Sequence, residues 1–129
     1  MSIARQQLGR SAERLAASRL AAAGFSILGR NVHIRMAEVV GEIDLIALEG
    51  DALVFVEVKA ARTGSSLGPE RPVLAVGPRK RLRLRRLARA WLAQDERRPA
   101  FSVLRFDVIG VRVNADGQAT AFEHLRGAF

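Results

Sequence analysis

The sequence predicts an α/β fold in which two helices flank a mixed central sheet. Apolar residues recur at helical spacing near the start of the chain and again after Pro78, whereas short β-branched runs bounded by turn residues fill much of the remainder. The predicted order is helix, three strands, helix, strand, followed by a last edge strand. Because 129 residues suit one modest core, we expect a single domain over residues 1–129.

Composition restricts both the compartment and the partners. The chain has no cysteine, which excludes disulfides and thiolate metal sites and agrees with a reducing cytosol, so we expect a cytoplasmic protein. No apolar run reaches about 18 residues, so neither a signal peptide nor a membrane span is expected. His33 and His124 are too far apart in sequence to suggest a zinc site. The net charge of +8 favours a polyanionic partner: nucleic acid or, as the weaker option, an anionic membrane surface.

The first helix is expected over about residues 2–23, and Gly24 suits the C′ position that follows it. Glu13 lies beside the apolar stripe of this helix. Residue chemistry alone favours a solvated glutamate near Arg10 and Arg14 over one that points across the domain. The stripe consists of Leu8, Ala12, Leu15, Ala16, Leu20 and Ala23.

Two strand segments follow this helix. Residues 25–28 and 32–35 alternate between apolar and polar positions around Gly29-Arg30-Asn31. They form either one bent strand or two short strands that lead into the next element.

A β-hairpin is predicted over residues 41–59, where two apolar, β-branched runs flank Glu49-Gly50-Asp51. With Gly50-Asp51 as the two-residue turn, Asp44 lies directly opposite Glu57. With Glu49-Gly50 as the turn, these two carboxylates become diagonal neighbours. Because side chains alternate with period two, either register puts both carboxylates and Lys59 on one face of the hairpin.

These charges indicate a metal site. Two close carboxylates on a packed sheet repel each other, which raises the pKa of one of them or recruits a cation. Carboxylate oxygens are ligands of the kind that Mg²⁺ or Mn²⁺ takes. Lys59 returns to the same face two residues beyond Glu57, where it can hold an attacking water or a developing phosphate charge. The alternative is an ion-paired, solvent-facing side of an edge hairpin.

Residues 60–78 are predicted to form a long flexible loop. They are rich in Gly, Pro and Ser and contain few apolar anchors. Their position directly after Lys59 favours a binding loop or a lid over the substrate. A merely disordered connection is the alternative.

A second helix is predicted from Pro78, which suits the first helical position, and residues 95–99 close it. Its apolar side consists of Leu84, Leu87, Ala88, Trp91 and Leu92. The rest of its surface carries seven cations in eleven positions, which repel one another. A polyanion would relieve this repulsion and bind with strong salt dependence, whereas a solvated basic face is the alternative. The seven cations are Arg79, Lys80, Arg81, Arg83, Arg85, Arg86 and Arg89.

The last predicted elements are two strands and the turn between them. Residues 103–111 are apolar on both faces and therefore predict a central strand. A turn over residues 114–117 and an edge strand over residues 119–125 follow. Asp107 interrupts the central strand, and a structural pairing with Arg105 is favoured over a place in the charged site.

The order of these elements, together with Asp44 and Glu57-Val58-Lys59, resembles the PD-(D/E)xK nuclease superfamily and its restriction-endonuclease-like α-β-β-β-α-β core. More closely, the chain is similar to the YraN family, small bacterial proteins often compared with Holliday junction resolvases. A bare D…ExK pattern is weakly specific, but the ordered set of matching motifs spans nearly the whole chain. These motifs are Gly9-Arg10-Ser11-Ala12-Glu13, Ala23-Gly24-Phe25, Arg30-Asn31, Gly41-Glu42-Ile43-Asp44-Leu45-Ile46-Ala47, Phe55-Val56-Glu57-Val58-Lys59, Pro78-Arg79-Lys80 and Arg105-Phe106-Asp107-Val108-Ile109.

The resemblance implies that Asp44 and Glu57 are metal ligands and that Lys59 assists the nucleophilic water. It also implies an auxiliary acidic role for Glu13 and makes Lys80 a candidate phosphate contact. The residues expected to bind nucleic acid are Arg79, Lys80, Arg81, Arg83, Arg86 and Arg62.

The chain departs from the family pattern at three places. It is a few residues longer between residues 31 and 41. Ala60-Ala61-Arg62 stands where the family usually has Thr-Arg, so a hydroxyl is lost and the arginine is displaced by one. Gly77 replaces the usual threonine before Pro-Arg-Lys. The Asp-Glu-Lys set is intact, and the departures bear on turnover rate and substrate preference.

The sequence thus leads to a hypothesis: a cytoplasmic DNA endonuclease that depends on Mg²⁺ or Mn²⁺ and acts on branched, flapped or single-stranded substrate. DNA is favoured over RNA. Two other hypotheses stay open: a non-catalytic nucleic-acid-binding module of a DNA- or RNA-processing complex, and an interaction protein whose basic helix docks an acidic partner. Junction-cutting relatives of this fold work as dimers, so the resemblance makes a homodimer a candidate assembly.

Overall fold

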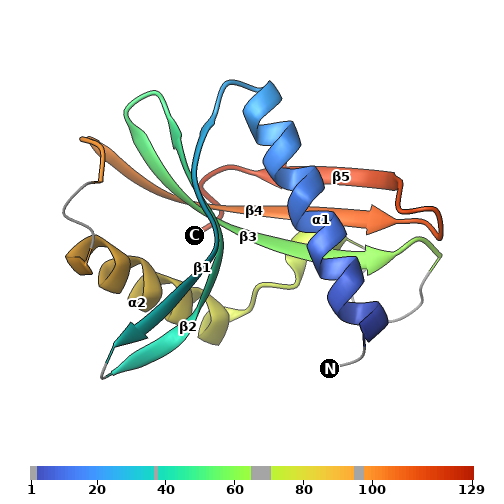
Figure 1. Ribbon diagram of the computed structural model, residues 1–129, viewed down its shortest axis with the longest axis horizontal. Coiled ribbons are helices and arrows are strands. Elements are labelled where there is room, and N and C mark those ends of the chain that lie inside the picture. The colour runs from blue at the N-terminus through green and yellow to red at the C-terminus, as the bar shows by residue number, and fades with distance from the viewer. Residues whose placement is uncertain (1–2, 37, 65–70, 95–97) are drawn as a thin grey trace.

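A five-stranded sheet in the order β1-β2-β3-β4-β5 forms the centre of the protein. The computed structural model describes residues 3–36, 38–64, 71–94 and 98–129 (Figure 1). Strands β3 and β4 are parallel, and the other neighbouring strands are antiparallel. The predicted α/β class with a mixed sheet is confirmed, and the order is consistent with a restriction-endonuclease-like core. The elements are α1 (Ile3–Ala22), β1 (Ser26–Met36), β2 (Val39–Glu49), β3 (Ala52–Arg62), a 3₁₀ helix η1 (Pro72–Leu74), α2 (Pro78–Gln94), β4 (Val103–Val113) and β5 (Ala119–Leu125).

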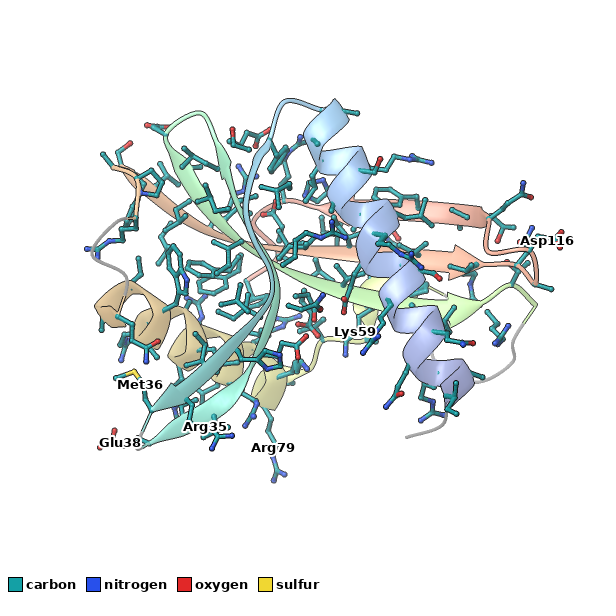
Figure 2. All side chains as sticks on the ribbon, viewed as in Figure 1. Arg35, Met36, Glu38, Lys59, Arg79 and Asp116 are labelled. Atoms are coloured by element: carbon teal, nitrogen blue, oxygen red, sulfur yellow. The ribbon has the colours of Figure 1, made fainter. Side chains whose placement is uncertain are left out.

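The two helices cover opposite faces of the sheet, each over its own apolar core. Leu45 and Val54 belong to the core under α1, whereas Ile46 and Phe55 belong to the core under α2. Both faces of the hairpin are therefore buried, as the continuous apolar runs predict. The end of β1 and the start of β2, marked by Met36 and Glu38 in Figure 2, lie beside α2. In the described part of the chain, neither helix has the length and apolar character that crossing a membrane requires.

Helix α1 ends in a Schellman motif. Gly24 takes a positive φ of 97°, which a residue without a side chain adopts at low cost. The Phe25 amide donates to the Leu20 carbonyl at 3.0 Å, and the Gly24 amide donates to the Ala21 carbonyl at 3.1 Å. Leu20 and Phe25 are both buried in the core under α1. This packing fixes the angle at which α1 crosses the sheet, and therefore where Glu13 lies.

Residues 26–36 form one bent strand, which decides between the two predicted alternatives. The register of β1 against β2 shifts between Ile27 and Gly29, so the strand bends at a bulge. Asn31 follows with a φ of 49°, a left-handed conformation that asparagine tolerates better than most residues. The bend carries the second half of β1 and the paired part of β2 toward α2 (Figure 1).

The hairpin between β2 and β3 has the register that Gly50-Asp51 predicts, with Ile46 opposite Phe55. The expected pairing of Asp44 with Glu57 is wrong, because the ladder ends one pair earlier, at Leu45 and Val56. Beyond this point β2 remains paired with the bent strand β1 and separates from β3. A side chain fills the gap: the Asp44 Oδ2 atom accepts a hydrogen bond of 2.8 Å from the Val58 amide.

The segment predicted as a loop over residues 60–78 is partly regular. Strand β3 continues to Arg62 because its last residues pair in parallel with β4, Arg62 lying opposite Val113. Residues 72–74 form η1, which packs on β4 at Gly110. The middle of the predicted loop, residues 65–70, lies outside the described residues.

Replacing Gly110 with alanine is expected to destabilise the protein by about 1–3 kcal/mol, the usual range for overpacking a core. A Cβ atom at this position would lie 2.5 Å from the Val73 backbone nitrogen, and backbone cannot rotate away. Urea unfolding followed by circular dichroism measures the loss. The control is Gly9→Ala, whose Cβ would meet nothing within 4 Å; that helical position should be neutral or slightly stabilised. Equal stability of Gly110→Ala and wild type would contradict the packing of η1 on β4.

Asp107 is a structural residue, as expected, and its network is larger than the predicted pair. Its buried carboxylate accepts hydrogen bonds from the Arg105 guanidinium at 2.8 and 2.9 Å and from the Gly127 amide at 3.0 Å, and it lies 2.8 Å from His124 Nε2. Burial by itself would raise the pKa of Asp107, but the hydrogen bonds from His124 and Arg105 outweigh it and lower the pKa to about 2. This network ties β4 to β5 and to the residues after it.

Candidate functional site

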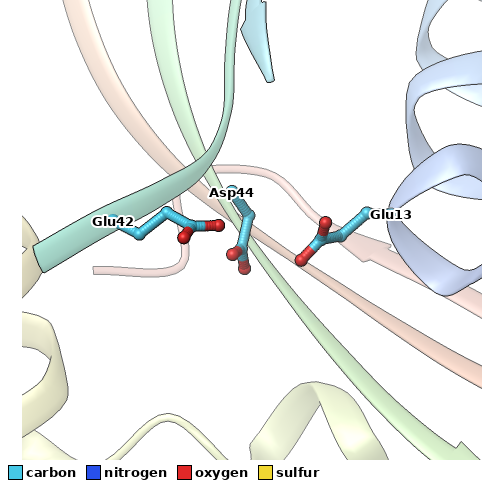
Figure 3. A group of neighbouring side chains, drawn as sticks. All are labelled: Glu13, Glu42 and Asp44. Atoms are coloured by element: carbon cyan, nitrogen blue, oxygen red, sulfur yellow. The ribbon is translucent and has the colours of Figure 1, made fainter. Parts of the chain in front are cut away.

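Three carboxylates meet where β2 leaves β3, and we call them the acidic cluster: Glu13, Glu42 and Asp44. One carboxylate oxygen from each lies within 4.8 Å of one from each of the others. Figure 3 shows Glu13 reaching from α1 on one side and Glu42 from β2 on the other, with Asp44 between them. Residues from two distant elements therefore converge on one small volume of negative charge.

Asp44, in the middle of the acidic cluster, has a strongly raised pKa. Burial and the neighbouring Glu57 charge raise its pKa to about 8, and the Glu13 charge adds to the effect. The hydrogen bond from the Val58 amide acts in the opposite direction but does not compensate. Glu57 is thus close enough to repel Asp44, so the two carboxylates that the sequence proposed as ligands share one site.

Glu13 is half-buried and faces Asp44, so the solvated position favoured by residue chemistry is wrong. Helix α1 lies against the sheet, and that packing turns Glu13 inward. Burial raises the pKa of Glu13, and the nearby Glu42 charge raises it further. A hydrogen bond with Asn31, at the bend of β1, partly offsets both effects.

Two lysines meet the Glu57 carboxylate beside the acidic cluster. The Glu57 side chain is 5% exposed, and its Oε1 atom lies 3.5 Å from Lys59 Nζ and 3.2 Å from Lys80 Nζ. Lys59 comes from β3 and Lys80 from the first turn of α2. The structure therefore gathers five predicted site residues around one point: Glu13, Asp44, Glu57, Lys59 and Lys80.

The acidic cluster opens into a cleft of about 1170 Å³ between α1, β1 and the end of β3. The lining includes two members of the cluster and one lysine: Glu13, Glu42 and Lys59. It also includes four arginines: Arg5, Arg10, Arg14 and Arg30. A cleft lined by both carboxylates and arginines can hold a cation and attract a polyanion at the same place.

The other predicted nucleic-acid contacts lie outside the described lining of this cleft. Two of them stabilise the fold: Arg81 Nε donates to the Val76 carbonyl at 3.0 Å, and Arg83 donates to the Val40 carbonyl. Arg62, Arg79 and Arg86 are exposed. The seven cations of α2 therefore do not form one uniform basic surface.

The sequence prediction did not place several residues of the site. Glu42 was given no role, although its spacing two residues before Asp44 puts both side chains on the same face of one strand. Arg10 and Arg14 lie one helical turn apart, and Glu13 lies between them in the sequence. A helical pattern alone does not show which face of the helix meets the sheet. Arg30 reaches the cleft through the bend of β1, which no local pattern predicts.

The donor atoms of this site fit a hard divalent cation. Every candidate ligand is a carboxylate oxygen, the class that Mg²⁺ and Mn²⁺ prefer. Burial and neighbouring carboxylates raise the pKa of Glu13 and Asp44, and a cation bound between them would favour their ionised forms. Asp44 could hold such a cation together with Glu13, Glu42 or Glu57.

Comparison with known proteins gives a match over most of the chain. A model described as "Uncharacterised protein family UPF0102" matches residues 12–111. A UPF0102 protein of Streptomyces griseus subsp. griseus is 49% identical over 124 residues, which cover 96% of this chain and 97% of the relative. A UPF0102 protein of Pelotomaculum thermopropionicum is 42% identical over 129 residues and covers 100% of both chains. One from Rhodococcus opacus is 44% identical over 122 residues, 95% of each chain.

Proposed function

We propose that this chain, which belongs to the uncharacterised protein family UPF0102, is a divalent-metal-dependent nuclease that hydrolyses phosphodiester bonds in DNA. Membership in UPF0102 agrees with the resemblance to the YraN family. The observation that carries the proposal is that the acidic cluster lies next to Glu57 and its two lysines, and that Glu13, Glu42 and Lys59 of this group line a cleft with four arginines. Close carboxylates repel each other, and a bound cation would relieve this repulsion while keeping them ionised.

The residues have separate roles in this proposal. Asp44, with Glu13, Glu42 or Glu57, holds Mg²⁺ or Mn²⁺. When bound, the cation polarises the scissile phosphate and lowers the pKa of water. Lys59 orients the attacking water and offsets the charge that develops on the phosphate. Lys80 holds the Glu57 carboxylate through its ion pair of 3.2 Å.

The reaction adds one water across a P–O bond. The water oxygen bonds to phosphorus, and the bond from phosphorus to the leaving oxygen breaks. One proton of the water is taken up by that leaving oxygen, and the other is released. The proposed substrate is DNA with branched, flapped or single-stranded regions, and the exposed Arg62 at the end of β3 is a candidate for a further phosphate contact.

Cleavage of a labelled panel tests the proposal. The panel contains single-stranded DNA, duplex, flap, four-way junction and RNA, each with Mn²⁺, Mg²⁺ or EDTA. We expect product that requires the metal, and a loss of at least 10–100-fold in Glu13→Gln, the range seen when groups that support a metal are removed. Asp116→Asn is the matched control, because Asp116 is exposed at a turn well away from Lys59 (Figure 2).

Four outcomes would contradict the proposal of a metal-dependent nuclease. Product in EDTA, or undiminished product in Glu13→Gln, would contradict the metal site. Binding without cleavage across the whole panel would favour the non-catalytic module. Weak binding to every nucleic acid would favour a protein partner for the basic surface.

A further inference from the structure

Several basic side chains of the arginine-rich helix α2 make contacts within the protein. Besides the carbonyl contacts of Arg81 and Arg83, the Arg85 guanidinium lies 5.0 Å from the ring centre of Phe106 and 5.6 Å from that of Phe129. Lys80 is paired with Glu57. These contacts stabilise α2 on the sheet and reduce what the helix can offer to a ligand.

The cleft arginines Arg10, Arg14 and Arg30 are placed differently. All three are exposed and line the cleft that contains Glu13, Glu42 and Lys59. Within the described parts of the chain, their guanidinium groups form no hydrogen bond or ion pair. Arg10 and Arg14 are one helical turn apart, a spacing at which like charges destabilise a helix. Their mutual repulsion has a cost in the free protein, and within the described residues no direct hydrogen bond or ion pair offsets it.

Gly9 lies next to these arginines in the interior of α1, where glycine costs roughly 0.5–1 kcal/mol relative to alanine. Its φ is not in the left-handed region, and a Cβ atom there would meet nothing within 4 Å. Neither backbone conformation nor packing therefore requires glycine. The position faces the cleft, so the missing side chain leaves the helix backbone open to close approach by a ligand.

The cleft lining also indicates how a ligand is recognised. Its described residues include neither phenylalanine nor tryptophan, although aromatic platforms are the usual means of holding the bases of a single strand. Arginine recognises phosphate oxygens well because its guanidinium presents several donors in a plane. The lining therefore suits a phosphodiester backbone, and His33 is the aromatic side chain among its described residues that could stack on a base.

We infer that the substrate backbone runs through the cleft along α1, with its phosphates held by Arg10, Arg14 and Arg30 and its closest approach at Gly9. The inference rests on the proposed function and assigns the binding groove to α1 and β1 in place of the exposed arginines of α2. The path leads the backbone directly over the acidic cluster. Single strands and duplexes share this phosphodiester chemistry, so both are used in the test.

The test compares two triple variants that each remove three positive charges. The cleft variant is Arg10→Gln, Arg14→Gln and Arg30→Gln. The matched control is Arg79→Gln, Arg86→Gln and Arg89→Gln, at exposed positions of α2 outside the cleft lining. Fluorescence anisotropy measures binding to a labelled single strand and to the duplex of the same length, in EDTA and over a series of salt concentrations. EDTA prevents metal-dependent cleavage, so this result is independent of whether the protein is a nuclease.

We expect the cleft variant to lose at least about tenfold in affinity, with a salt slope that is shallower by about 2 for the single strand and about 3 for the duplex. The control should lose less than about threefold. Wild-type affinity in the cleft variant, or an equal or larger loss in the control, would overturn the assignment. A loss confined to single strand or to duplex identifies which form the groove takes.

A second variant tests the groove without changing its charge. Gly9→Gln adds a bulky neutral side chain at a helical position where glutamine is the better helix former. We expect a Tm at or above that of wild type together with at least fivefold weaker binding. Unchanged affinity in a folded Gly9→Gln would show that the backbone does not pass Gly9 and would overturn the path.

Discussion

Asp44→Asn is expected to reduce metal-dependent cleavage by more than about 100-fold, since even groups that only support metal ligands are worth 10–100-fold. Asparagine keeps the shape of the side chain, and its amide oxygen can still accept the hydrogen bond that Val58 donates at 2.8 Å. The change removes the charge without opening the gap between β2 and β3. Loss of cleavage in this variant therefore reports on the charge and not on the fold.

The same variant should be more stable than wild type when no metal is present, by about 1–2 kcal/mol. Burial, together with the Glu57 and Glu13 charges, disfavours the ionised form of Asp44, and the neutral asparagine avoids this cost. Thermal unfolding with EDTA and with Mn²⁺ measures both effects: wild type should gain Tm on adding Mn²⁺, and Asp44→Asn should not. Asp116→Asn should behave as wild type. A destabilised Asp44→Asn that still gains Tm with Mn²⁺ would rule out this carboxylate as a ligand.

Asp107→Ala is expected to cause the largest loss of stability, about 3–5 kcal/mol, because it leaves the half-buried Arg105 guanidinium without its main partner. The Gly127 amide and His124 lose their contacts to the same carboxylate. Urea unfolding at neutral pH measures the loss. A change below about 1 kcal/mol would show that the remaining Arg105 contact with Glu49, at 2.8 Å, suffices.

Asp107 also gives the protein a specific acid sensitivity. Its pKa is lowered from 3.8 to about 2 in the folded state, so its stabilisation is complete above about pH 4 and is lost as the pH falls through 2. The shift corresponds to roughly 2 kcal/mol. Asp107→Asn should lack this component of the pH dependence. Parallel stability curves for Asp107→Asn and wild type between pH 2 and pH 4 would contradict the assignment.

What the sequence predicted well depends on neighbours along the chain. Gly50-Asp51 sets the hairpin register, Pro78 starts α2, and residues 119–125 form the edge strand, because a turn or a periodic run determines each of them locally. The separation of β2 from β3 at Asp44 was not predicted, because it follows from the bend in β1.

The same distinction between local and tertiary determinants applies to the residues of the candidate site. Asp44, Glu57 and Lys59 could be named because they stand out on adjacent strands. Glu13 joined them only by resemblance, because its inward position depends on how α1 packs. The roles of the arginines were not predictable: composition counts charges, and only tertiary contacts distinguish Arg83, which donates to a carbonyl, from Arg10, which faces the cleft.

The parallel pairing of β3 with β4 has a kinetic consequence. Residue 52 pairs with residue 103, and the same large separation holds through residues 62 and 113, so the whole ladder closes a long stretch of chain. Such non-local pairing pays its loop-closure entropy before it gains contacts, and it slows folding. The meander of β1, β2 and β3 is local and can form first, with one edge of β3 unpaired. We expect docking of β4 to limit the folding rate, and with it the delivery of Glu57 and Lys59 in their final positions.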